Sequence, residues 1–311
     1  MNQWLKLEGR ALVPGKFVDR LLIVDGHAYA YRAFHAISDL RSPAGQPTNA
    51  IYGFVKMLGK MRVAIEPTHL IVVWDGGLSA ERTAVLPEYK AQRPPMPDDL
   101  RPQLDEMAGY LKAAGVASFC RAGVEADDYI ACLARHASGA GMAVVIASSD
   151  KDFMQLVSAR VGLLNPGDKS GMVWTDEQVR AKAGVEPSQI VDWLSLTGDS
   201  VDNIPGVPGV GPKTAAEWLK QFGSVAALFE RLDEVKSEKL RTALRAAAAA
   251  VRRNRELVRL RDDLACDFSP AALAGKPADS GRLRELYGRW GFKGMLAALE
   301  ETARERQAVL I

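Results

Sequence analysis

Short runs of apolar residues recur along the first half of the chain, and each ends at a polar turn. They cover residues 21–24 (LLIV), 69–74 (HLIVVW) and 143–147 (AVVIA), with a further candidate run at 116–120. Each run is apolar throughout rather than alternating, which is typical of a strand buried on both faces. Helical patterns, such as 50–64 and 100–114, lie between the runs. The pattern predicts an α/β fold in which helices cover both faces of a mostly parallel central sheet.

An aspartate stands at the carboxyl end of each of the three clearest runs. Asp25 and Asp75 follow the first two runs directly, and Asp150 follows the third after two serines. The carboxyl ends of parallel strands meet at one edge of an α/β sheet, which is where ligands bind. One such residue is ordinary in a loop, whereas three in three strands favour a shared site.

More acidic residues are expected at the same edge. The helical pattern after the candidate strand at 116–120 and the position two residues beyond Asp150 add Glu125, Asp127, Asp128 and Asp152. Acids in a first helical turn commonly cap the helix and complement its dipole, which would account for one or two of these. Ser149 or Asp150 would cap the following helix in the same way.

Together with two aspartates further along, these residues form a set of nine candidate metal ligands. The set comprises Asp25, Asp75, Glu125, Asp127, Asp128, Asp150, Asp152, Asp199 and Asp202. So many carboxylates at one edge would repel one another strongly without cations between them. Hard divalent ions with oxygen ligands, Mg²⁺ or Mn²⁺, suit such a set. No histidine belongs to it, which argues against zinc.

A glycine-rich stretch follows Asp199 and Asp202 and leads into another helical pattern. Its residues of interest are Gly206, Gly209, Gly211, Lys213 and Thr214. A turn of this kind at a helix N-terminus presents free backbone N–H groups and the positive end of the helix dipole to an anion. An anion grip beside an acidic pair predicts that phosphate binds next to the metal ions.

The segment between residues 75 and 100 has no clean period and contains three closely spaced prolines. It begins directly after a candidate ligand, and long loops beside sites are usually functional or disordered. We expect its cations to contact phosphate and its tyrosine to stack on a base, with a purely structural loop as the alternative. The residues concerned are Arg82, Tyr89, Lys90 and Arg93.

A basic stretch covers residues 239–261, with eight Lys or Arg against one acid, Glu256. A solvated basic helix face and a phosphate-binding surface are both open interpretations of this imbalance.

Bulk composition narrows the class of protein. The 311 residues are 48% apolar and 25% charged, as in globular proteins with one large core and a smaller unit. The net charge of +2 decides nothing, and the three cysteines form neither a metal spacing nor a disulfide framework. No apolar run reaches the roughly 18 residues that span a bilayer, and the N-terminus lacks a signal peptide's apolar region. We expect a cytoplasmic protein without membrane contact.

Six stretches, in this order between residues 21 and 222, carry a resemblance to a known family. They are VDGHAYAYRAFHA, VVWDGG, EYKAQRPPMPDDLRPQ, GVEADDYIA, ASSDKDFMQLV and LTGDSVDNIPGVPGVGPKTA. With them the chain resembles the 5′-nuclease family, which includes the 5′→3′ exonuclease domain of bacterial DNA polymerase I, phage 5′ nucleases and flap endonucleases. The resemblance implies a metal-dependent 5′→3′ exonuclease and 5′-flap endonuclease that hydrolyses DNA near single-strand/duplex junctions.

The resemblance also implies roles for single residues. All nine acids match the family's ligands for two or more ions, which activate water and stabilise the leaving oxygen. The glycine-rich stretch matches a helix–three-turn–helix motif that grips duplex backbone and often holds a potassium ion through main-chain carbonyls. Arg82, Lys90 and Arg93 match catalytic cations of the arch over the site, where Tyr89 also lies. Tyr31 and Arg32 match positions near the strand entrance.

The expected organisation has three parts. Residues 1–19 form an N-terminal extension, and residues 20–187 form the α/β nuclease core, with the arch at about 76–103. Residues 188–311 form a helical region that contains the helix–three-turn–helix motif at about 188–223. We expect a free-standing, monomeric nuclease without a polymerase domain, associated with the nucleoid and with a separate DNA polymerase as a candidate partner.

Two other functions compete with this prediction. A DNA-junction binding protein with weakened catalysis is disfavoured by the intact acids, above all Asp199 and Asp202. A PIN-type ribonuclease would share the sheet but usually carries fewer acids and no glycine-rich duplex grip, so the stretch from Gly206 to Lys213 argues against it.

Overall fold

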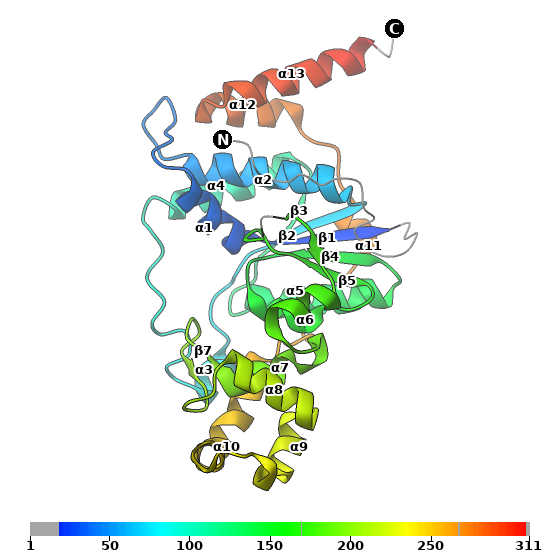
Figure 1. Ribbon diagram of the computed structural model, residues 1–311. Helices are drawn as coiled ribbons and strands as arrows, with labels where there is room; N and C mark the ends of the chain where they lie inside the picture. The colour runs from blue at the N-terminus through cyan, green and yellow to red at the C-terminus, as the bar shows by residue number, and fades with distance from the viewer. Residues whose placement is uncertain (1–18, 169, 267, 309–311) are drawn as a thin grey trace.

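A six-stranded sheet with strand order β3-β2-β1-β4-β5-β6 forms the centre of the protein (Figure 1). The computed structural model describes residues 19–168, 170–266 and 268–308. The strands are β1 (Arg20–Asp25), β2 (His69–Val73), β3 (Ala117–Phe119), β4 (Ala143–Ala147), β5 (Val161–Leu164) and β6 (Val173–Trp174). Only the pairing of β6 with β5 is antiparallel. The predicted mostly parallel sheet is confirmed. The predicted extension at residues 1–19 lies, except for its last residue, outside the described part.

Side chains of β1 explain why the strands are apolar throughout. Leu21 and Ile23 pack into the hydrophobic core on one face of the sheet, and Leu22 and Val24 pack into the core on the other. All four are fully buried. Alternate residues of a strand point to opposite faces, so a sheet covered on both sides needs an apolar residue at every position.

Helices cover both faces of the sheet, as Figure 1 shows. One face is covered by α1 (Gly26–Ala36), α2 (Asn49–Ile65) and α4 (Arg101–Ala113). The other is covered by α5 (Ala126–Gly139), the 3₁₀ helix η1 (Lys151–Leu156) and α6 (Asp176–Ala183). The two predicted helical patterns match α2 and α4 closely.

A group of helices with one short hairpin extends the second face at the lower end of Figure 1. These are η2 (Pro187–Gln189), α7 (Ile190–Thr197), the hairpin β7 (Gly198–Asp199) and β8 (Ile204–Pro205), α8 (Pro212–Phe222), α9 (Val225–Glu230), η3 (Leu232–Glu234) and α10 (Glu238–Val258). Gly223 ends α8 as its C-cap with φ 84°, a conformation that glycine adopts without strain. The basic stretch forms most of α10.

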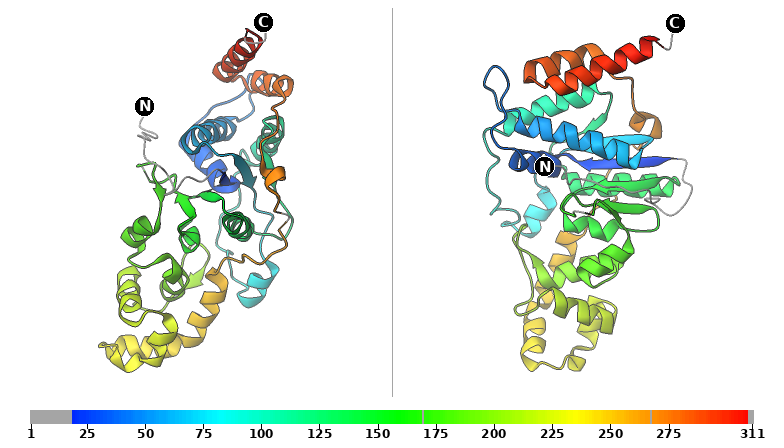
Figure 2. Two further views of the ribbon diagram at one scale, coloured as in Figure 1. Left: turned by 90° about the vertical axis from the view of Figure 1, so that its right-hand side faces the viewer. Right: turned by 45° about the horizontal axis from the view of Figure 1, so that its top comes forward.

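The end of the chain returns to the opposite side of the sheet. It contains α11 (Pro270–Leu273), α12 (Ser280–Trp290) and α13 (Lys293–Ala308). Ala274 forms an antiparallel bridge with His69 at the start of β2, and α12 packs against α4. Figure 2 shows α12 and α13 at the opposite end of the molecule from α10. The expected helical region at 188–311 is therefore split between two places.

The segment expected to be an aperiodic loop contains a short helix, α3 (Ala80–Val85). Ser79 caps it by accepting a hydrogen bond from the backbone N–H of Arg82. Six residues are too few to show a helical period, which is why the pattern missed it. No helix in the described part of the chain is long and apolar enough to cross a membrane.

Candidate active site

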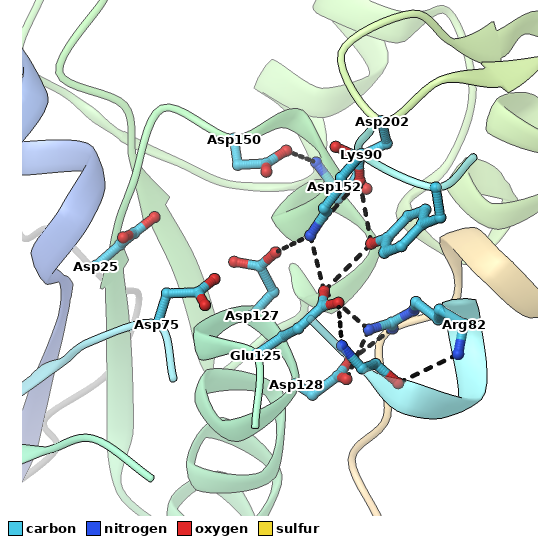
Figure 3. Close-up of polar contacts among 12 residues, drawn as sticks. Asp25, Asp75, Arg82, Lys90, Glu125, Asp127, Asp128, Asp150, Asp152 and Asp202 are labelled. Atoms are coloured by element: carbon cyan, nitrogen blue, oxygen red, sulfur yellow. Dashed lines mark hydrogen bonds and ion pairs between the residues drawn. The ribbon is translucent and has the colours of Figure 1, made fainter. Parts of the chain in front are cut away.

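The acidic residues at the strand ends converge, as Figure 3 shows. Asp25 ends β1 and caps α1, since one carboxylate oxygen accepts from the N–H of Ala28 at 3.0 Å. Its other oxygen accepts from the hydroxyl of Ser148 at 2.8 Å. Asp150 caps η1 in the same way, accepting from the N–H of Asp152 at 2.9 Å. The predicted capping role of Asp150 is confirmed, and backbone caps fix the direction of both carboxylates.

Burial and mutual repulsion make the charged form of several of these carboxylates unfavourable. Burial raises the pKa of Asp25 to about 6 and that of Asp152 to about 8, and Asp150 contributes to both shifts through its charge. Burial and neighbouring acids also raise the pKa of Asp127 and of Asp150. Buried like charges of this kind favour the binding of cations.

Asp152, Asp199 and Asp202 form the tightest acidic group. All three are buried, and each offers a carboxylate oxygen within 4.8 Å of the others. Asp199 ends β7 and accepts from the N–H of Val201 at 2.9 Å, which shapes the turn that carries Asp202. An all-carboxylate set of oxygens fits a hard divalent ion. Asp75 completes the cluster from the end of β2, half-buried, with one oxygen accepting from Gly77 N–H.

Glu125 differs from the other strand-end acids, because cations and donors surround it. Its oxygens contact the ammonium of Lys90 at 2.7 Å and the guanidinium of Arg82 at 3.1 Å. The N–H of Ser79 and the hydroxyl of Tyr89 donate to it as well. Burial alone would raise the pKa of Glu125, but Lys90 and Arg82 hold it below its ordinary value.

Lys90 and Tyr89 reach into the cluster from the segment after α3. The Lys90 ammonium lies 3.8 Å from Asp202 and 3.9 Å from Asp127, and these carboxylates raise its pKa although burial favours the neutral amine. The Tyr89 hydroxyl lies between Glu125 and Asp202, and only 3% of the residue is exposed. This differs from the expectation of a ring free to stack on a base. Arg93 is more open and pairs with Asp202 at 2.6 Å.

Arg82 and Asp128 bind each other rather than facing the cluster. Both oxygens of Asp128 accept from the Arg82 guanidinium at 2.7 Å, and the N–H of Arg261 donates to the same carboxylate at 2.9 Å. Arg82 also donates to the main-chain carbonyls of Leu257 and Arg259, where α10 ends. The expected roles of Arg82 on the phosphate and of Asp128 on a metal ion stay predictions. The pair instead joins α3, α5 and the segment after α10.

The glycine-rich turn connects the β7–β8 hairpin to the start of α8. Gly206 lies so close to α7 that a Cβ there would fall 2.3 Å from the carbonyl of Thr197. Gly209 has φ 81°, and Gly211 precedes α8 without a side chain to cap it. The first N–H groups of α8 are therefore available to an anion. Lys213 is exposed there.

The remaining predicted DNA contacts lie on α8 and on α1. Thr214 is half-buried in the first turn of α8. Tyr31 and Arg32 are half-buried on α1, which starts directly after Asp25. On α10, Arg241 pairs with Glu238 and Arg255 pairs with Asp192, so part of the basic stretch is satisfied within the chain.

Three residues of the site have no counterpart in the sequence predictions: Lys151, Ser148 and Asn254. The Lys151 ammonium lies 2.5 Å from Asp199 and 3.3 Å from Asp152. Asn254 donates to the carbonyls of Ser195 and Pro205, which fastens α10 to the turn. The position of Lys151 between two predicted ligands could have identified it from the sequence. Asn254 could not be identified in this way, because it lies far along the chain from its partners.

The raised pKa values of Asp25 and Asp152 predict a pH-dependent stability of the metal-free protein. A carboxyl whose pKa is higher in the folded chain binds more protons when folded, so stability falls as pH rises from about 4 to about 8. With EDTA present, we expect the thermal unfolding midpoint to fall by several degrees between pH 5 and pH 8.5. Mg²⁺ should raise the midpoint more at pH 8.5, because the ligands are then ionised.

Scanning fluorimetry at a series of pH values measures both effects. Asp152→Asn should remove much of the loss above pH 6, whereas Asp176→Asn on the exposed face of α6 should not alter the profile. A midpoint in EDTA that stays constant over this range would contradict the prediction.

Two family models cover most of the chain. The N-terminal resolvase-like domain of 5′-3′ exonucleases matches residues 20–184, and their C-terminal SAM fold matches residues 185–281. A 5′-3′ exonuclease of Aquifex aeolicus is 39% identical over 92% of this chain and 96% of its own length. DNA polymerase I of Bacillus caldotenax is 36% identical over 94% of this chain, which spans only 33% of that enzyme.

Solved structures share the fold. The T5 D15 protein co-crystallised with metal ions has a TM-score of 0.61 and 25% identity, covering 78% of this chain and 89% of its own. The catalytic core of Rad2 in complex with DNA substrate has a TM-score of 0.62 and 17% identity, covering 88% of each chain. The matched models and the Aquifex relative together show that this chain belongs to the 5′-3′ exonuclease family.

Proposed function

We propose that this protein is a 5′→3′ exonuclease that also cuts 5′ flaps, hydrolysing DNA phosphodiester bonds with the help of divalent metal ions. One observation carries the proposal. A cluster of buried, mutually repelling carboxylates gathers at the carboxyl edge of the parallel sheet, where ligands of such folds bind. A phosphate bound there would meet the metal ions, and the open N-terminus of α8 would contact backbone phosphates elsewhere on the duplex.

Seven carboxylates are available to hold the ions. They are Asp25, Asp75, Asp127, Asp150, Asp152, Asp199 and Asp202. When bound, divalent ions supply a more acidic water and stabilise the charge that develops on the phosphate and the leaving oxygen. Mg²⁺ and Mn²⁺ both suit these oxygens, because the set is built of carboxylates alone.

Residues of the arch keep the cluster in order and meet the substrate. Lys90 neutralises Glu125 and holds the arch segment against Asp202, to whose carbonyl its own backbone N–H donates at 3.0 Å. Arg93, with 41% of its side chain exposed, is placed to add positive charge beside the phosphate. Direct action of Lys90 and Arg82 on the phosphate stays a prediction from the resemblance.

Duplex binding is assigned to the turn before α8. The free N–H groups at its start and the exposed Lys213 would contact backbone phosphates, which position a duplex without reading its bases. Thr214, and Tyr31 and Arg32 on α1, belong to the same proposal. A potassium ion at the main-chain carbonyls of this turn, a monomeric state, a separate DNA polymerase and a nucleoid location rest on the resemblance alone.

Two glycines of this turn, Gly206 and Gly211, give a matched pair of variants. Gly206→Ala would press a methyl group onto the carbonyl of Thr197, whereas a Cβ at Gly211 has no neighbour within 4 Å. We expect Gly206→Ala to weaken duplex binding at least about tenfold, because the turn must shift, and Gly211→Ala to change it less than about threefold. Fluorescence anisotropy on a flap substrate in Ca²⁺ measures both. Equal affinities would contradict the prediction.

A single assay tests the proposed function. Purified protein is mixed with an end-labelled 5′-flap duplex in Mg²⁺ or Mn²⁺, and products are mapped with the flap's 5′ end free or blocked. Cleavage at the junction that persists when the 5′ end is blocked supports flap endonuclease activity. Mononucleotides or short oligonucleotides that form only when the 5′ end is free support exonuclease activity. A flap left uncut in both ions overturns the proposal, and binding without cleavage would identify a junction-binding protein.

A further inference from the structure

Lys151 places a positive charge inside the tightest acidic group. It is the first residue of η1, between Asp150 and Asp152 in the sequence. Its ammonium lies 2.5 Å from a carboxylate oxygen of Asp199 and 3.3 Å from one of Asp152. These two residues, with Asp202, form the group whose oxygens converge within 4.8 Å.

Lys151 contacts the same carboxylates that a divalent ion is expected to bind. Mg²⁺ binds oxygen ligands at about 2.0–2.1 Å, so an ion held by Asp152 and Asp199 would lie very close to an ammonium in hydrogen-bond contact with both. Two cations that close repel strongly in a partly buried site. The ammonium and the ion therefore cannot both keep their full set of contacts.

Lys151 is also able to leave, unlike the other lysine of the site. Its side chain is 37% exposed, whereas that of Lys90 is 2% exposed and is held by Glu125. A lysine stem is long and flexible, and an exposed stem lets the ammonium swing into solvent at low cost.

We propose that Lys151 competes with a divalent ion for the carboxylates of Asp152 and Asp199, and thereby sets the affinity of that ion site. This rests on the proposed function, which makes these carboxylates metal ligands. The ion must displace the ammonium, so its affinity is lower than the three acids alone would provide. Lys151 thus sets the affinity of the ion site through the carboxylates it shares with the ion and is not a catalytic residue.

Mn²⁺ binding to the full-length protein tests this without measuring cleavage. Free Mn²⁺ is followed by electron paramagnetic resonance during titration of the wild type, Lys151→Met, Lys151→Arg and a control, Lys182→Met, on the exposed side of α6. We expect Lys151→Met to tighten the weakest site at least about tenfold, and Lys182→Met to leave it unchanged. Lys151→Arg, which keeps the charge, should stay near the wild type.

The outcomes separate this inference from the proposed function. A wild type that binds no Mn²⁺ overturns the proposed metal site itself. A wild type that binds Mn²⁺ while Lys151→Met binds it equally or more weakly overturns the competition, because the lysine would then organise the site rather than oppose the ion.

A second measurement needs no variant and so does not depend on a variant's folding. The wild type is acetylated with a limiting amount of an amine-reactive ester, with and without Mg²⁺, and each lysine's modification is read by mass spectrometry. Release from Asp199 should make Lys151 react several-fold faster in Mg²⁺, relative to Lys182 in the same sample. An unchanged or slower reaction of Lys151 overturns the displacement.

Discussion

Asp150→Asn is expected to lower the rate of flap cleavage by at least about 10³-fold while flap binding stays within about threefold of the wild type. Asp150 is placed by its cap on η1, and its charge acts on Asp25, Asp127 and Asp152. Asparagine keeps the capping oxygen and the shape but removes the negative charge that helps to hold the ions. Metal ions contribute several kcal/mol to such reactions, which corresponds to a loss of this size.

Single-turnover cleavage in Mg²⁺ and anisotropy in Ca²⁺ measure the two quantities separately. The matched control is Asp176→Asn, whose carboxylate pairs on the surface with Arg180 at 2.9 Å, and it should cleave like the wild type. If Asp150→Asn retained more than about a tenth of the wild-type rate, the carboxylate cluster would not be the reaction centre.

Arg82→Met should lower the free energy of unfolding by about 3–5 kcal/mol, because it leaves the buried carboxylate of Asp128 without its cation and removes one of the two cations on Glu125. Arg82 is 6% exposed, contacts Glu125 and Asp128, and donates to two carbonyls at the C-terminal end of α10. A guanidinium used in this way stabilises the protein and holds α3 against α5. Urea denaturation of metal-free protein at pH 7 measures the loss.

A second substitution separates a stabilising ion pair from a catalytic cation. Arg82→Met combined with Asp128→Asn should recover part of the lost stability, since the double variant removes the unpaired charge as well. Arg180→Met, which breaks the exposed pairs with Asp176 and Glu186, should leave the unfolding curve close to that of the wild type. An Arg82→Met protein of normal stability that no longer cleaves would instead assign Arg82 to the substrate.

Much of the fold and the general position of the site follow from the sequence. The continuous apolar runs identify strands buried on both faces, and the acids after them mark the carboxyl edge of a parallel sheet. The hydrophobic pattern of a sequence follows burial, so it predicted the buried strands β1, β2 and β4. The two-residue strand β6 is too short to leave such a pattern.

The direction of individual side chains was not predictable in the same way. Asp127 and Asp128 are adjacent in the first turn of α5, yet one faces the cluster and the other faces Arg82 (Figure 3). Successive helical residues point about a quarter turn or more apart, so sequence proximity does not imply a shared target. The partner of Asp128 comes from α3, a helix that the pattern did not reveal.

Because α12 packs against α4, the core on that face of the sheet is completed only late in translation. The core on that face of the sheet includes Leu283, Leu286, Trp290 and Phe292. During translation, the elements that surround the acidic cluster are complete once α10 and the segment after it have been made. The apolar surface of α4 stays open to water until α12 has left the ribosome. The last helices thus cover a part of the core that is synthesised first. A ribosome that stops before them releases a nuclease with this part of its core exposed.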